Sequence, residues 1–145
     1  MKKLFLLLAL LLGIGMSASA KDSYSRDASV LPEAAKTTIA NNFKAKVSLV
    51  KIDKTLGIVT EYEVILTDGS EISFDKHGNW EGVEMPANTS VPKGFLLKGI
   101  TDYVGKKHSG QKIVSIDKEG NGYEVELSNG IDIKFDKNGA FVRYD

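Results

Sequence analysis

Alternating apolar and polar residues mark two stretches of this chain as half-buried β-strands. From Tyr62 the chain reads YEVILTDGSEISFDKHGNW, and from Tyr123 it reads YEVELSNGIDIKFDKNGAF. In both stretches apolar side chains recur at every second position, with charged or hydroxyl residues between them. Such alternation is typical of an antiparallel sheet with one packed face and one face open to water.

The two stretches are also copies of each other. Ten of their nineteen positions are identical without a gap, at a separation of about 60 residues. That period is too long for a common solenoid repeat and suits a duplicated α+β unit. A single unit of this length buries little surface and is marginally stable, so joining two units in one sheet gives a physical reason for the duplication.

Each copy is predicted to contain one helix followed by four strands. Pro32 suits the first turn of one helix and Pro92 that of the other, because proline lacks the N–H that a first turn leaves unpaired. The second helix carries Gly94 and Gly99 and is expected to be shorter or less regular. The strands are predicted at residues 47–53, 60–66, 71–75 and 80–84, and at 112–117, 123–127, 131–136 and 141–144.

Glycine-containing turns separate these strands. Asp68-Gly69 and Asn129-Gly130 are typical of two-residue hairpin loops, in which both positions tolerate positive φ. Asp75–Gly78 and Asp136–Gly139 suit a type I turn closed by a glycine bulge. The first loop of copy one, at residues 54–59, is expected to be longer than its counterpart at 118–122.

The alternation assigns the side chains of each copy to two faces. The apolar set is expected to be buried under the helices and comprises Tyr62, Val64, Leu66, Ile72, Phe74, Tyr123, Val125, Leu127, Ile133 and Phe135. The opposite face is rich in carboxylates and is the candidate binding face, with Glu63, Ile65, Glu71, Ser73, Glu124, Glu126, Asp132 and Lys134.

Trp80 is the single tryptophan and a further candidate for the binding face. A three-residue loop before it would place it beside Phe74 on the packed face. One additional bulge residue would turn it to the open face, where it could anchor a partner. The same two alternatives apply to Phe141 in the second copy.

The first twenty residues have the features of a secretory signal peptide. Lys2 and Lys3 precede the apolar run Leu4–Ile14, and Ala18-Ser19-Ala20 provides a cleavage pattern before Lys21. A membrane anchor is the alternative, but the apolar run is shorter than the ~20 residues that span a bilayer. The expected organisation is a signal peptide at 1–20, a flexible lead-in at 21–29, repeats at 30–85 and 91–145, and a linker at 86–90. The protein is expected to be periplasmic or secreted, without membrane association after cleavage.

Composition excludes several functional classes. The chain has 19 basic and 19 acidic residues, and loss of Lys2 and Lys3 leaves a net charge of −2, which argues against nucleic-acid binding. No cysteine is present, so no disulfide, thiolate nucleophile or cysteine-ligated zinc can form. His77 and His108 lack histidine partners at i+4, and Asp117–Gly122 resembles half of a calcium loop whose twelfth position is Ser128 instead of glutamate. The sequence predicts no catalytic residue, metal site or cofactor.

The strand pattern resembles the PepSY-like family, the β-lactamase-inhibitor-like group of small exported Bacteroidetes proteins. The resemblance covers residues 30–145 and is carried by the motif Y-E-V-x-L…G…I-x-F-D-x-x-G-x-W/F, present from Tyr62 to Trp80 and from Tyr123 to Phe141. It implies an α+β fold: a tandem duplication of a helix plus a four-stranded antiparallel module, with the sheets joined into one curved sheet and the helices on one face. It also implies binding or restraint of another exported protein. The chain lacks the disulfides and long loops of β-lactamase inhibitor proteins, so that activity does not carry over.

The sequence therefore predicts a non-enzymatic exported binding module. Its open sheet face would engage an exported protein or peptide, and its carboxylates favour a basic one. The alternative is an inhibitor or folding aid of an exported peptidase or other hydrolase. The oligomeric state and the identity of the partner are left open.

Overall fold

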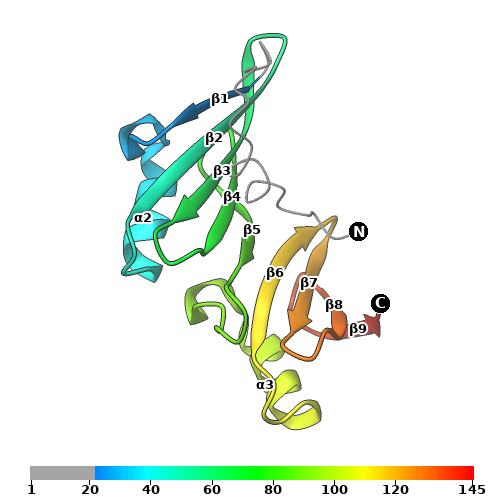
Figure 1. The fold of residues 1–145 in the computed structure, drawn as a ribbon. Helices are drawn as coiled ribbons and strands as arrows, with labels where there is room; N and C mark the ends of the chain where they lie inside the picture. The colour runs from blue at the N-terminus through cyan, green and yellow to red at the C-terminus, as the bar shows by residue number, and fades with distance from the viewer. Residues whose placement is uncertain (1–21) are drawn as a thin grey trace. The chain divides into compact units, whose positions relative to one another are not determined.

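The computed structural model describes residues 22–145 of the 145-residue chain (Figure 1). The predicted signal peptide lies outside the described residues. No helix of residues 22–145 is long and apolar enough to cross a membrane. The elements are β1 (Asp22–Ser25), η1 (Ala28–Val30), α2 (Glu33–Asn42), β2 (Val47–Thr55), β3 (Ile58–Leu66), β4 (Glu71–Asp75), β5 (Trp80–Glu84), η2 (Lys93–Phe95), α3 (Lys98–Lys107), β6 (Ile113–Glu119), β7 (Gly122–Leu127), β8 (Asp132–Asp136) and β9 (Phe141–Tyr144).

The described strands belong to one nine-stranded sheet, and their order in the sheet is their order along the chain. Neighbouring strands pair antiparallel, as in β2 with β3 and β6 with β7. Each of α2 and α3 is followed by four strands, which agrees with the predicted element order. The α+β class is confirmed, whereas a common origin of the two halves and the curvature of the sheet remain predictions.

The ninth strand, β1, was not expected. The sequence predicted a flexible lead-in at 21–29, but residues 22–25 pair with β2 and place Tyr24 opposite Lys51. The sequence Asp22–Ser25 shows no apolar alternation and still forms a strand, because an edge strand can be held by its backbone hydrogen bonds alone. Residues 28–30 then form the short helix η1. The Ser29 N–H donates to the Asp27 carboxylate at 2.9 Å and so caps the start of this helix.

The chain divides into two compact units after Glu81, earlier than the predicted linker at 86–90. We call Asp22–Glu81 the first unit and Gly82–Asp145 the second. The boundary falls inside β5, because Gly82, Val83 and Glu84 pair with β6. The last strand predicted for copy one therefore contributes its final three residues to the ladder of the second unit.

In the first unit, α2 packs on the strands through its narrow apolar stripe. Ala35 and Ile39 are buried, and Pro32 precedes the helix as predicted. The helix also lies close to the turn between β4 and β5. A β-carbon at Gly78 would lie 2.9 Å from the Ala35 nitrogen and from Pro32 Cβ, and the φ of Gly78 is +88°. Gly78 is therefore required both by the turn and by the helix above it.

In the second unit the helix begins later than predicted. Pro92 precedes the 3₁₀ turn η2, and α3 starts only at Lys98, after Leu97. The helix α3 has ten residues, as α2 does, so the expected shortening is wrong. Position 99 is a glycine for a different reason, a close approach of two backbone segments. A β-carbon at Gly99 would lie 2.5 Å from the Gly139 carbonyl oxygen. Gly99 thus serves helix docking.

Three loop predictions require correction. Asp68-Gly69 and Asn129-Gly130 each belong to a three-residue loop, because Leu66 N–H donates to the Ser70 carbonyl and Leu127 N–H donates to the Ile131 carbonyl. In these loops only Gly69 and Gly130 have positive φ. The loop between β2 and β3 is not longer than its counterpart. Thr55 pairs with Ile58, and Glu119 pairs with Gly122, so two residues close each hairpin. The ladder of the first hairpin continues farther than the apolar pattern indicated.

The predicted core is largely confirmed. Eight of the ten expected residues are buried: Val64, Leu66, Ile72, Phe74, Val125, Leu127, Ile133 and Phe135. Tyr62 and Tyr123 are only half-buried. Each tyrosine occupies the same place in its repeat, which is consistent with a ring whose polar end reaches water.

Candidate binding faces

The register brings the predicted binding residues together as cross-strand pairs within each unit. In the first unit Glu63 pairs with Ser73, and Ile65 pairs with Glu71. In the second unit Glu124 pairs with Lys134, and Glu126 pairs with Asp132. Directly paired residues point to the same face of a sheet, so the paired side chains of each unit share a face.

The exposure of these residues differs from the prediction. Ser73 is fully buried, and Ile65, Glu71 and Glu124 are 4%, 7% and 6% exposed. Period-two alternation predicted a face open to water, but these positions lie on strands with a neighbour on either side. Long side chains on adjacent strands can cover such central positions. Glu63, Glu126, Asp132 and Lys134 are of intermediate exposure, as is Trp80 at the start of β5.

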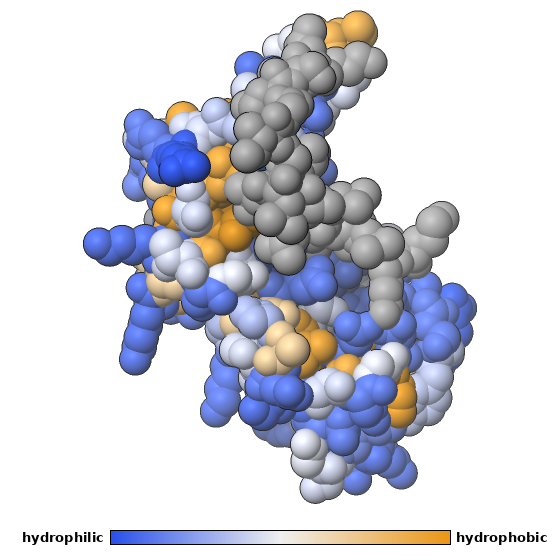
Figure 2. Space-filling view, viewed as in Figure 1, coloured by the Kyte–Doolittle hydropathy of each residue, from blue (hydrophilic) through white to orange (hydrophobic). Residues whose placement is uncertain are grey.

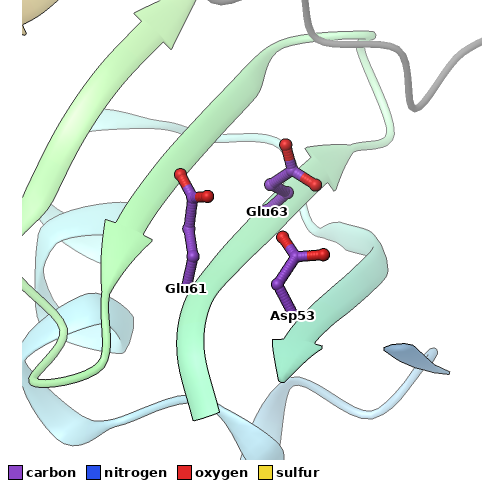
Figure 3. Close-up of side chains that lie close together, drawn as sticks. All are labelled: Asp53, Glu61 and Glu63. Atoms are coloured by element: carbon purple, nitrogen blue, oxygen red, sulfur yellow. The ribbon is translucent and has the colours of Figure 1, made fainter. Parts of the chain in front are cut away.

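In the first unit a lysine lies among several carboxylates. The Lys51 ammonium is 3.1 Å from Asp53 and 3.2 Å from Glu63, with Asp22 of β1 at 4.0 Å. The ladder pairs Lys51 with Glu63 and Asp53 with Glu61, so all four side chains lie on one face of β2 and β3. Figure 3 shows the carboxylates of Asp53, Glu61 and Glu63 on the same side of the two strands.

Burial and ion pairing shift the pKa values of Lys51 and Glu63 in the first unit. Burial disfavours the charged ammonium, but the hydrogen bond to Asp53 and the attraction of Glu63 and Asp53 outweigh it and raise the pKa of Lys51. Burial raises the pKa of Glu63, and the nearby Lys51 charge opposes that rise. Lys51 therefore remains an ammonium and compensates part of the negative charge around it.

In the second unit a different lysine has the same role. The Lys134 ammonium lies 3.4 Å from Glu119, 3.5 Å from Asp145 and 3.7 Å from Glu124. Burial, followed by a hydrogen bond with Asp145 and repulsion from Glu119 and Asp145, raises the pKa of Glu124 to about 7. The buried Glu124 Oε2 atom accepts no hydrogen bond. Glu124 is thus the carboxyl of this cluster that takes up a proton near neutral pH.

The carboxylates of Asp53, Glu61 and Glu63 are close enough to contact one cation, since their nearest oxygens lie within 4.8 Å of one another. The Lys51 ammonium already contacts two of them. Calcium takes six to eight oxygen ligands, and an ammonium already placed among these carboxylates repels a second cation. These residues therefore fit an internal ion pair better than a metal ion.

The second unit also has an aromatic cluster that sequence analysis missed. Tyr103 of α3 stacks on Phe141 of β9, with ring centroids 4.7 Å apart. The Tyr103 and Tyr144 hydroxyls are 2.8 Å apart, and His108 Nε2 is 2.9 Å from the Tyr144 hydroxyl. Because Phe141 pairs with Phe135 and contacts α3, it lies on the helix-covered face, which decides between the two alternatives for this residue. The recurrence of aromatic residues in 141–144 could have indicated the cluster.

Comparison with known proteins agrees with this architecture. The model of the PepSY-like family, described as β-lactamase-inhibitor-like, matches residues 60–143. A candidate periplasmic protein of unknown function from Bacteroides vulgatus is 37% identical, with a TM-score of 0.79, over 86% of this chain and 98% of its own. A candidate calcium-regulated periplasmic protein from Bacteroides thetaiotaomicron is 34% identical, with a TM-score of 0.77, over 86% and 96%.

A second Bacteroides vulgatus protein, a candidate periplasmic member of the DUF2874 family, is 31% identical with a TM-score of 0.77, over 88% of this chain and 98% of its own. No curated protein matches. None of these descriptions names a catalytic activity. Their periplasmic assignment supports the predicted periplasmic or secreted location. The matched residues 60–143 and the extent of similarity to the solved structures show that the chain belongs to the PepSY-like family.

Proposed function

We propose that this protein is a non-catalytic binding module of the periplasm that engages a basic exported protein or peptide through its carboxylate-bearing sheet faces. The observation that carries the proposal is the gathering of carboxylates around a lysine in each unit. In the first unit Asp53, Glu61 and Glu63 gather near one lysine, Lys51. In the second unit Glu119, Glu124 and Asp145 gather near Lys134, and Arg143 lies 3.7 Å from Asp145. A carboxylate-rich face of this kind steers association with a partner of opposite charge.

The test begins with affinity capture from the native periplasm and continues with the purified partner. Asp53→Asn combined with Glu61→Gln removes two negative charges from the face of the first unit. Glu33→Gln combined with Asp102→Asn makes the same change of charge at helix positions with exposed side chains and serves as the control. The face variant should bind about tenfold more weakly, mainly through a slower association rate, and the deficit should shrink at high salt.

Equal binding of the face variant and the control would contradict the proposal. Glu124 is not suitable for this experiment, although the alternation predicted an exposed position. It is 6% exposed and lies beside Lys134, so replacing it with lysine would disturb folding as well as binding. The carboxylates chosen for the variant are of intermediate exposure, which allows binding to be measured on a folded protein.

The second candidate function is an inhibitor or folding aid of an exported hydrolase. The family description as β-lactamase-inhibitor-like favours it. An inhibitor would form a tight stoichiometric complex and abolish the activity of its partner at one equivalent. A folding aid would instead raise the refolding yield of the partner without remaining bound. Unchanged activity and unchanged refolding yield would leave only the simple binding function.

We infer that calcium regulation does not extend to this protein. The Bacteroides thetaiotaomicron protein is described as a candidate calcium-regulated protein. In this chain the only group of three or more potential metal ligands among residues 22–145 is Asp53, Glu61 and Glu63. The Lys51 ammonium contacts two of these carboxylates, and its positive charge disfavours a second cation among them.

A further inference from the structure

The tip of the β2–β3 hairpin exposes two large apolar side chains. Leu56 is 95% exposed and Ile58 is 67% exposed, and they flank Gly57. The space-filling view shows apolar atoms at the end of this hairpin (Figure 2). Isolated exposed leucines are common on protein surfaces, so exposure alone does not indicate a site.

The backbone at this tip is unfavourable for leucine. Thr55 pairs with Ile58, so Leu56 and Gly57 form a two-residue loop with φ values of +52° and +78°. Loops with two positive φ values favour asparagine, aspartate and glycine, because a β-carbon crowds the left-handed conformation. Leucine at the first position therefore lowers stability relative to asparagine, and its side chain makes up for little of that loss because it is almost fully exposed.

The second unit provides a natural control for the hairpin. There Glu119 pairs with Gly122, and the two-residue loop is Gly120-Asn121. A polar loop, with positive φ at Gly120 and not at Asn121, thus closes the equivalent hairpin in the same chain. Folding does not explain the apolar residues of the first hairpin, so a role in contact with another molecule is the remaining physical reason.

The surroundings of the tip select the kind of partner. Asp53, Glu61 and Glu63 lie on the same two strands, on one face below the tip. This negative charge opposes approach to an anionic membrane surface, and two apolar side chains bury too little area to anchor a protein in lipid. A narrow apolar tip above carboxylates is complementary to an apolar pocket with a basic rim.

We propose that the hairpin tip Leu56–Ile58 inserts into an apolar, basic-rimmed pocket of an exported partner protein. The inference rests on the proposed binding function and adds the element that enters the partner. Insertion of this kind buries both side chains and places the carboxylates of the first unit against the rim. The tip then contributes to the dissociation rate and the carboxylates to the association rate.

The first experiment locates the contact. The photoreactive residue p-benzoylphenylalanine is placed at position 56, or at position 121 as the matched control, in the full chain expressed in its own bacterium. Irradiation should give one protein adduct from position 56 and none of that mass from position 121. An adduct only with lipid, only with a second copy of this chain, equally from both positions, or no adduct at all would overturn the inference.

The second experiment uses the identified protein in purified form. Leu56→Asn combined with Ile58→Thr should weaken binding at least tenfold, to a similar extent at low and high salt, whereas Asn121→Ser should leave affinity within about twofold. The tip variant should also melt about 1–4 °C higher than the unmodified protein, because asparagine is favoured in the loop. Unchanged affinity of the tip variant would overturn the inference.

The two proposals fail in distinguishable ways. If the tip variant binds normally and Asp53→Asn with Glu61→Gln does not, the face binds the partner and the tip has no role. If only the tip variant loses affinity, the insertion stands and the proposed charge-steered face is wrong. Normal binding by both variants overturns both proposals.

Discussion

The two units each place one lysine among carboxylates but take it from different strands. Glu63 and Glu124 occupy the same position of the repeated sequence. Glu63 pairs with Lys51 on the preceding strand and with Ser73 on the following one. Glu124 pairs with Asp117 on the preceding strand and with Lys134 on the following one. A buried or half-buried carboxylate needs a nearby cation, and either neighbouring strand can supply it.

The comparison also separates what the units share from what each has alone. The shared residues fill the core and close the turns, such as Phe74 with Phe135 and Gly78 with Gly139. The units differ at the hairpin tip, which is apolar only in the first, and at the aromatic cluster, which includes Tyr103 and Tyr144 of the second. The shared set is explained by folding, whereas the apolar hairpin tip of the first unit is not, and the proposed insertion depends on this difference.

The largest expected effect tests whether the units are energetically coupled. Phe74→Ala and Phe135→Ala each remove a fully or almost fully buried ring and should cost about 3–5 kcal/mol of unfolding free energy. We expect one unfolding transition for each variant, because the boundary between the units falls inside β5 and no linker separates them. Calorimetry that resolved two transitions would show that the units unfold independently.

A smaller effect tests helix docking in the second unit. Gly99→Ala would place a β-carbon 2.5 Å from the Gly139 carbonyl oxygen and should destabilise the protein by about 1–3 kcal/mol. Gly105→Ala in the same helix meets open space and should stabilise by about 0.5–1 kcal/mol. Chemical denaturation of both variants gives the comparison. Equal changes would mean that α3 does not depend on the close approach at Gly99.

The charge clusters should differ in their response to pH. The pKa of Glu124 is raised to about 7 in the folded protein from an ordinary value of 4.5, chiefly by burial. The folded state then binds more protons than the unfolded state between these values, so this contribution to stability falls as pH rises from 5 to 8. Because Lys134 partly screens the Glu124 charge, the free energy of unfolding should fall by on the order of 1–2 kcal/mol over this range.

Glu124→Gln should remove most of this pH dependence and stabilise the protein at pH 8. Glu33→Gln, at an exposed position of α2, is the matched control and should leave the profile unchanged. Melting temperatures measured from pH 5 to 8 would provide the test. A wild-type profile that rises with pH, or a Glu124→Gln profile identical to wild type, would show that Glu124 remains ionised.

The extent to which the sequence predicted this molecule depends on the kind of signal at each element. The bounds of β4, β5 and β9 were predicted correctly, because a glycine-containing turn precedes each of them. β1 was missed because backbone pairing needs no apolar pattern. Pro92 was misassigned because a proline also suits the start of a 3₁₀ turn. The faces of Glu71, Ser73 and Glu124 were predicted, but alternation carries no information on how neighbouring strands cover them.

The candidate sites were predicted in part for a related reason. The alternation of side chains along the strands placed Glu63, Glu124 and Lys134 on their faces. Which lysine lies beside each carboxylate depends instead on the cross-strand register, which joins residues far apart in the chain. The apolar hairpin tip could have been found from the sequence, since Leu56-Gly57 lies where Gly120-Asn121 lies in the second copy. The expected longer loop at 54–59 hid this equivalence.

The smallest expected effect concerns calcium and the ammonium of the first cluster. Because Lys51 contacts Asp53 and Glu63, about 1 mM calcium should shift the melting temperature of the wild-type protein by less than about 1 °C. Lys51→Gln removes the ammonium and leaves Asp53, Glu61 and Glu63 converging on one another, so this variant should lose stability and regain part of it with calcium. Lys134→Gln is the control in the second unit, whose carboxylates do not form a comparable ligand group, and it should respond less. A wild-type shift of several degrees would mean that calcium displaces Lys51, and the ammonium would then be a competitor of the metal instead of its replacement.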